Sequence, residues 1–345
     1  VNIIAKIYAH RCTGEASILA ILMMIFGVAI LLLNQISVKS RKSYTTVTGK
    51  SGQISKFNLG RSGKYIIAII LIIITFFTSI FPIVSFAFET FLPNPGDYSF
   101  LYTGDPDNLT TKWWVTNENI TENGMYGQQG ILYNDMIWHA YKGTIMVSVC
   151  CALTAGTIGT LIGYAVSKNR RSRWANYVNS MAFLPYLMPS IAVGVAFFIL
   201  FSNKYVNLFN TYALLIIVGT VKYIPFASRS SLNSMLQLSG EIEEAAIIQD
   251  IPWTKRMTRI IIPIQKTSII SGYLLPFMTC LRELSLFILL CVQGFILSTT
   301  LDYFDEMGLY AFSSGINLIL IVTILICNAL VNKATGASLD KGIGG

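Results

Sequence analysis

The residues of this sequence that could do chemistry form two groups, an acidic segment and a charged pair inside an apolar run. The acidic segment places Glu241, Glu243 and Glu244 ahead of a short stretch of Ala and Ile that Pro252 closes. Negative charge is favoured in the first turn of a helix and proline cannot continue one, so this segment predicts a short amphipathic helix. Such a helix could pair with a partner protein, or it could lie solvated at a membrane surface.

The charged pair is Arg282-Glu283, followed by Ser285 in the same apolar run. A lone charge inside a bilayer costs several kcal/mol unless it is paired or faces water. The pair therefore either belongs to a translocation path or forms a structural ion pair near the external interface. Pro185 and Pro189 interrupt another apolar run, where they either expose backbone along a path or produce a plain kink.

The residue patterns that enzymes use are missing from the sequence. It contains no Gly-x-x-x-x-Gly-Lys-Ser/Thr phosphate loop, no His-Glu-x-x-His and no Gly-x-Ser-x-Gly, and its six cysteines have no Cys-x-x-Cys spacing. His10 and His139 are isolated from other metal-ligating residues. We therefore expect a chain that is not an enzyme, with no catalytic residue, no metal site and no cofactor of its own.

The composition indicates a protein that crosses a membrane several times. Hydrophobic residues make up 53% of the chain, charged residues only 12%, and the mean hydropathy is +0.59. An average soluble domain carries about 25% charged residues. The net charge is +8, and the charged residues lie between the apolar runs, which favours contact with a lipid bilayer over contact with nucleic acid.

A helix needs about 20 apolar residues to cross the hydrocarbon core, and the sequence offers seven candidate runs. They predict an all-α polytopic membrane fold, and Gly156, Gly159 and Gly163 in the third run predict a small-residue face for close helix packing. The candidate runs are 16–38, 65–88, 143–167, 174–203, 205–221, 267–301 and 307–332.

The charges between the runs predict the orientation, because Lys and Arg near span ends stay on the cytoplasmic side. Of the 25 basic residues, 19 lie in alternate segments: 39–64, 168–173, 222–266 and the C-terminal end from 333. The intervening segment 89–142 carries seven acids. The pattern predicts an external N-terminus, a cytoplasmic C-terminus, and a cytoplasmic loop that begins at Lys222.

The segment 222–266 resembles the EAA signature of binding-protein-dependent ABC importer permeases. The spacing of the signature is kept, with Asp250 where the family has Gly and Ile262 where it has Leu. Asp tolerates a left-handed backbone better than most residues, so we expect the turn at Asp250 to be preserved. The matching residues are Glu244-Ala245-Ala246, Asp250 and Ile260-Ile261-Ile262-Pro263.

By this resemblance, the short helix is a coupling helix that inserts into a groove on a separate cytoplasmic ATPase, where ATP is bound. The residues implied in ATPase coupling are Glu243, Glu244, Ala245, Ala246, Asp250, Ile260 and Pro263. Segment 181–201, with its two prolines, and Arg282-Glu283-Leu284-Ser285 are similar to elements of ferric-iron-type permeases. The translocation path would then include Pro185, Pro189, Arg282, Glu283 and Ser285.

The resemblance also implies a domain organisation, with about seven transmembrane helices. Residues 1–36 would be the last helix of a preceding repeat, 37–64 a basic cytoplasmic linker, 65–333 a six-helix permease domain, and 334–345 a cytoplasmic tail. Within the permease domain, 89–142 would be an external loop and 222–266 the cytoplasmic EAA-type loop.

The implied function is that of the membrane-spanning subunit of an ABC importer for ferric iron in the cell inner membrane. Its partners would be a dimeric ATP-binding subunit, an external binding protein, and a second permease half, separate or from the missing N-terminal part. Two alternatives stay open. An ion-coupled secondary transporter would need ionisable residues near the midplane, where only Arg282-Glu283 interrupts the apolar runs, and a membrane scaffold would not need the Glu-Ala-Ala spacing.

Overall fold

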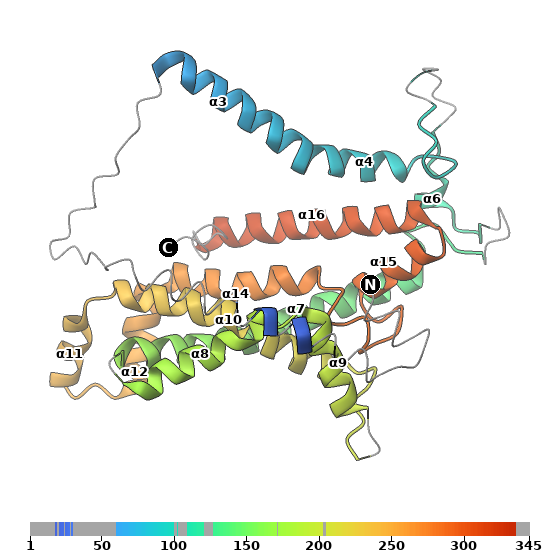
Figure 1. Ribbon diagram of the computed structural model, residues 1–345. Coiled ribbons are helices and arrows are strands. Elements are labelled where there is room, and N and C mark those ends of the chain that lie inside the picture. The colour runs from blue at the N-terminus through green and yellow to red at the C-terminus, as the bar shows by residue number, and fades with distance from the viewer. Residues whose placement is uncertain are drawn as a thin grey trace. The chain divides into compact units, whose positions relative to one another are not determined.

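The computed structural model contains helices and no strand within the residues that it describes (Figure 1). The described residues are 60–99, 102, 109–120, 127–170, 172–202 and 205–335, with scattered positions between 18 and 29. Most of the predicted first span 16–38, the linker and the tail lies outside them. The chain divides into two compact units, residues 1–27, 134–308 and 319–345, and residues 28–133 and 309–318.

The larger unit is built on three helices that pack against one another, listed with their bounds at the end of this paragraph. The first helix begins where the Asn134 side chain accepts a hydrogen bond from the backbone N–H of Ile137, and the second begins at a similar cap made by Thr211. The helices are α7 (Asp135–Lys168), α10 (Tyr212–Gln237) and α14 (Lys266–Leu281).

The predicted small-residue face of α7 is confirmed. A Cβ added to Gly159 would lie 2.5 Å from the Ala227 Cβ of α10, and one added to Gly163 would lie 2.7 Å from the Leu232 backbone nitrogen. A Cβ on Gly156 would meet the Tyr273 ring of α14 at 2.4 Å. Glycine at these positions lets the helix backbones approach closely.

Two bends are present, one within the predicted span 174–203 and one at residue 265, just ahead of the predicted span 267–301. In the first, α8 (Arg173–Leu187) and α9 (Ser190–Phe201) meet at an angle of 99°, at the Pro185 and Pro189 positions. In the second, the segment Trp253–Ile264 meets α14 at 86°. That segment consists of α12 (Trp253–Arg256), η4 (Met257–Ile261) and α13 (Ile262–Ile264).

Two predicted boundaries are corrected. The fifth run was expected to end at Val221, but α10 begins at Tyr212 and continues to Gln237. The sixth run was expected to continue to Leu301, but α14 ends at Leu281 and residues 282–296 are irregular before α15 (Leu297–Glu306) begins. Counting apolar residues misses the end of α10, because polar residues that face the interior of a bundle can continue a membrane helix. It misses the end of α14, because irregular backbone buried in protein can have an equally apolar sequence.

The smaller unit contains a long apolar helix and a short polar segment. The helix runs from α3 (Gly60–Thr75) through η1 (Phe76–Ile80) to α4 (Phe81–Glu89). In the polar segment, α6 (Lys112–Val115) buries Trp113, whose indole nitrogen donates to the Leu92 carbonyl at 2.7 Å. The first residues of α16 (Tyr310–Thr335) belong to this unit.

The structure bears out an all-α polytopic membrane protein. Four of its described helices are long and apolar enough to cross a membrane, or up to six if each bent pair is one span. The predicted number of seven spans stays a prediction, because most of the first run and part of the loops lie outside the residues described.

Candidate functional site

The predicted amphipathic helix is α11 (Gly240–Ile248). It begins where the Ser239 side chain accepts a hydrogen bond from the backbone N–H of Glu241, and Glu241 and Glu243 supply negative charge in the first turn. It ends at Gln249, and Asp250 follows with a φ of 51°. The expectation that Asp250 takes the left-handed backbone is therefore confirmed.

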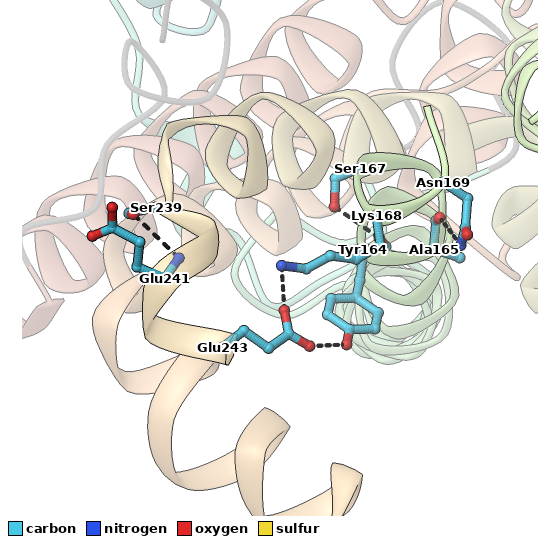
Figure 2. A network of polar contacts seen from close by, with 8 residues as sticks. All are labelled: Tyr164, Ala165, Ser167, Lys168, Asn169, Ser239, Glu241 and Glu243. Carbon is cyan, nitrogen blue, oxygen red and sulfur yellow. Dashed lines mark hydrogen bonds and ion pairs between the residues drawn. The ribbon is translucent and has the colours of Figure 1, made fainter. Parts of the chain in front are cut away.

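One acid of α11 is buried and turned toward α7, as Figure 2 shows. The Tyr164 hydroxyl donates to one carboxylate oxygen of Glu243 at 2.5 Å, and the Lys168 ammonium forms an ion pair with the other. Tyr164 and Lys168 lie one turn apart at the end of α7, so both reach the same carboxylate. We call these three residues the surface triad.

The electrostatics of the surface triad keep Glu243 charged. Burial by itself raises the pKa of the Glu243 carboxyl, but the hydrogen bonds from Lys168 and Tyr164 and the charges of Lys168 and Arg256 outweigh it. The pKa of Glu243 is therefore held below its ordinary value. The side chain of Glu243 is only 8% exposed, whereas that of Lys168 is 32% exposed, so the pair lies at the edge of the water.

The other residues of the signature are divided between buried and exposed positions. Ala246 is buried with Glu243 on the inner face of α11, while Glu244 and Ala245 are exposed. Asp250 and Pro263 are also exposed, and Ile260 is half-buried. Ile248 on the outer face is 83% exposed, and Ile247, one turn after Glu243, is 51% exposed.

A cavity of about 560 Å³ lies beside the surface triad. Its lining carries both signs of charge, from Lys168 and Arg170 at the end of α7 and from Glu243 and Glu244 on α11. The remaining wall is made by Tyr164, Ser167, Met235, Leu236, Leu238, Gly240 and Ile247. This end of the bundle can therefore accept a polar or charged group from outside the chain.

A second polar site lies inside α10, at a residue that the sequence analysis assigned to a loop. Lys222 is buried, and its ammonium donates to the Pro185 carbonyl at 3.1 Å and to the Met188 carbonyl. Both carbonyls belong to the break between α8 and α9, where Pro189 cannot donate a backbone hydrogen bond. The lysine thus satisfies backbone oxygens that the broken helix leaves free.

Tyr223, the next residue of α10, contacts the irregular segment 282–296. The Tyr223 hydroxyl donates to one carboxylate oxygen of Glu283 at 2.9 Å, and the Leu286 backbone N–H donates to the other at 3.2 Å. The Glu283 backbone carbonyl accepts from the Ser298 hydroxyl at 2.8 Å. Glu283 also interacts electrostatically with Lys222. We call Lys222, Tyr223 and Glu283 the buried triad.

The structure brings together only part of the predicted translocation path. The Pro185 carbonyl and Glu283 meet at the buried triad, and Pro189 forms the break beside it. Arg282 and Ser285 are exposed and do not take part in the described contacts of the triad. Among the described residues, no group of three or more His, Cys, Asp or Glu side chains could hold a metal ion.

Sequence reasoning missed Lys222 and Tyr223. The predicted fifth span ends before its first charged residue, which places Lys222 in the following loop. A helical signal was nevertheless present, because Tyr223 shares a face with the small residues Ser230 and Ser234 further along α10, and Lys222 lies one turn after Val218. All five are buried.

Comparison with known proteins supports one family over slightly more than half of the chain. Residues 155–337 match the family described as binding-protein-dependent transport system inner membrane component. The ferric transport system permease protein of Actinobacillus pleuropneumoniae is 22% identical over 278 residues, which are 80% of this chain and 37% of that protein. The putrescine transport system permease protein PotI of Escherichia coli K12 is 26% identical over 204 residues, 56% of this chain and 68% of that protein.

The chain shares its fold with solved structures, of which one is described here. It is a bacterial alginate ABC transporter in complex with a periplasmic protein bound to an alginate pentasaccharide, with a TM-score of 0.53 at 15% identity. The similarity covers 80% of this chain and 96% of the matched one. The chain spans about two fifths of the length of the ferric permeases that it matches.

Proposed function

The chain belongs to the binding-protein-dependent transport system inner membrane components, and from this premise we propose how its two sites serve import. We propose that it is the permease subunit of an ABC importer, driven through α11 by a separate cytoplasmic ATPase that binds the ATP. The observation that carries the proposal is the division of α11 into two faces. Glu243 holds its inner face to α7, while Ala245 and Ile248 are exposed on the outer face and Glu244 is exposed beside the cavity.

The geometry of α11 suits a lever between a partner and the bundle. The small side chain of Ala245 permits close approach of a partner, exposed Ile247 and Ile248 supply apolar area, and Glu244 can pair with a basic or hydrogen-bonding group. A displacement of α11 would pass through Glu243 to the end of α7, which packs along α10. Such rigid-body transmission through packed helices is a common form of switching.

We propose ferric iron as the cargo, because ferric permeases align over most of this chain. A putrescine permease also aligns, so the cargo would be chosen by an external binding protein rather than by the permease fold. A periplasmic protein is bound to the alginate transporter of similar fold, which supports such a partner here. A second permease half, as a separate chain or in the same one, would complete the assembly, with the C-terminus in the cytoplasm.

The test is a pull-down of the tagged chain from mild detergent, comparing the wild-type protein with Glu244→Arg. Mass spectrometry of the wild-type sample should identify a phosphate-loop ATPase, and the Glu244→Arg sample should lose it. The charge reversal should break a contact on the outer face without touching Glu243. A co-purified external binding protein would identify the cargo.

Glu306→Arg on α15 is the matched control, because Glu306 is an exposed acid on a helix remote in sequence from α11. It should retain the ATPase. If the folded wild-type chain recovers no ATPase, or if both variants lose it equally, the coupling role of α11 is wrong. An ion-coupled secondary transporter would then become the leading function, with the buried Lys222 and the half-buried Glu283 as its ionisable groups.

A further inference from the structure

Two helix breaks converge on two consecutive residues of α10. Lys222 donates to the carbonyls of Pro185 and Met188 at the bend between α8 and α9. Tyr223 donates to Glu283, at the point where α14 gives way to the irregular segment 282–296. Two adjacent residues of α10 therefore contact both breaks.

These contacts lie deep within a transmembrane helix. Lys222 is ten residues after the start of α10, which places it about 15 Å along the helix axis. Lys222 is 8% exposed and Tyr223 is 2% exposed. An ionisable residue at this depth is costly, and in membrane proteins it marks a functional path more often than simple packing.

The breaks themselves are the kind of structure that lines a path. Irregular backbone at membrane depth is tolerated where it is buried in protein or lines a water-filled cavity, and broken helices form the cargo sites of many transporters. The segment 282–296 also packs tightly on α9, since a Cβ added to Gly194 would lie 2.7 Å from the Leu286 carbonyl oxygen. The two breaks therefore belong to one packed region.

We infer that Lys222 and Tyr223 are positioning residues that latch the transport path closed by holding the α8–α9 bend and the 282–296 segment to α10. This inference rests on the proposed permease function. For the breaks to separate, the Lys222 ammonium must leave two carbonyl oxygens.

The latch can be tested in membrane vesicles through the reactivity of Cys280, without an ATPase or cargo. Cys280 is 3% exposed and belongs to the same buried cluster as Tyr223. In full-length protein with the other five cysteines replaced by alanine, we would measure the rate of labelling by N-ethylmaleimide. Tyr223→Phe loses one hydrogen bond to a charged group and should raise that rate about tenfold, and Lys222→Met loses two and should raise it at least as much.

Two controls separate a latch from general loosening. Thr220→Val removes the Thr154–Thr220 hydrogen bond, 2.5 Å long, from the same helix and should leave Cys280 protected. A protein that retains only Cys327, which lies in a different cluster, should label at the same rate with and without Lys222→Met. Tyr223→Phe keeps the ring and its packing, so this variant alone can test the latch if Lys222→Met fails to fold.

The latch is wrong if Tyr223→Phe leaves Cys280 as protected as in the parent protein, or if Thr220→Val exposes it equally. It is also wrong if Lys222→Met speeds the labelling of Cys327 as much as that of Cys280. None of these results bears on ATPase recovery in the pull-down. The failure of the latch and the failure of the permease function can therefore be told apart.

Discussion

The same three residue types, tyrosine, glutamate and lysine, form both the surface triad and the buried triad. In the surface triad, Lys168 pairs directly with the Glu243 carboxylate. In the buried triad, the lysine gives its hydrogen bonds to two backbone carbonyls and interacts with Glu283 only through its charge. The chemistry is shared, and what differs is the supply of water and of free backbone oxygens.

This difference shows how location sets what a charge can do. Near water, an ion pair can open and close at modest cost, because solvent replaces the partner that leaves. Lys222 is 8% exposed and is bound to the backbone of a broken helix, so opening must separate a buried ammonium from two carbonyl oxygens. The surface triad suits transmission of movement, and the buried triad suits a barrier to it.

The largest effect should come from breaking the buried triad at Glu283. Glu283→Leu would leave the Tyr223 hydroxyl and the Leu286 backbone N–H without their acceptor and would remove the negative charge near Lys222, and each buried donor left without a partner costs about 1–3 kcal/mol. The double variant Glu283→Leu, Lys222→Met removes both charges and should recover part of the loss. Thermal unfolding in detergent measures both. A double variant that melts no higher than Glu283→Leu alone would contradict a charge interaction between them.

A smaller effect should come from the surface triad, and it should depend on pH. Glu243→Gln removes the charge that Lys168 and Tyr164 hold, and the cost should be about 1 kcal/mol because Lys168 is partly hydrated. Since the folded pKa of Glu243 lies below the ordinary value of 4.5, this stabilisation is complete above that value. It is lost as pH falls through the lowered folded pKa.

The measurement is the difference in melting temperature between the wild-type protein and Glu243→Gln, followed from neutral pH into acid. That difference should stay constant down to pH 4.5 and then shrink. Glu241→Gln is the matched control on the same helix turn, because Glu241 is exposed and does not reach Lys168. A difference that grows in acid would show that the folded pKa is raised instead.

The smallest effect concerns the turn that follows α11. Asp250 has a φ of 51°, a conformation that costs an L-residue energy but costs glycine nothing. Asp250→Gly should therefore be neutral or stabilise by about 0.5 kcal/mol, and Asp250→Val should destabilise. Thermal unfolding of both variants gives the comparison. A glycine variant that melts well below the wild-type protein would mean that the Asp250 side chain makes an essential contact.

Much of the surface site could be predicted from the sequence because its determinants are local. Acids at the start of α11, Pro252 after it, and an Asp that tolerates a left-handed backbone all act within a few residues of one another. The choice between Glu243 and Glu244 as the buried acid was not local. It depended on where the end of α7 places Tyr164 and Lys168.

The buried triad could not be predicted, because each of its members is paired across a long stretch of sequence. Lys222 meets carbonyls 37 and 34 residues earlier, and Tyr223 meets a carboxylate 60 residues later. Counting apolar residues treats a lysine as the end of a span, and that rule fails where the fold supplies oxygens to a buried ammonium.

The amino-acid sequence by itself determined the membrane-spanning helices, the glycine face of α7, the amphipathic α11 and the family resemblance, since these follow from composition and short-range spacing. Only the tertiary structure decided which acid anchors α11 and that α10 carries a charge into the bundle. The physical reason is that a charge is stable in an apolar interior only where partners from distant segments meet it. Those partners exist only once α7, α8, α10 and α14 have packed.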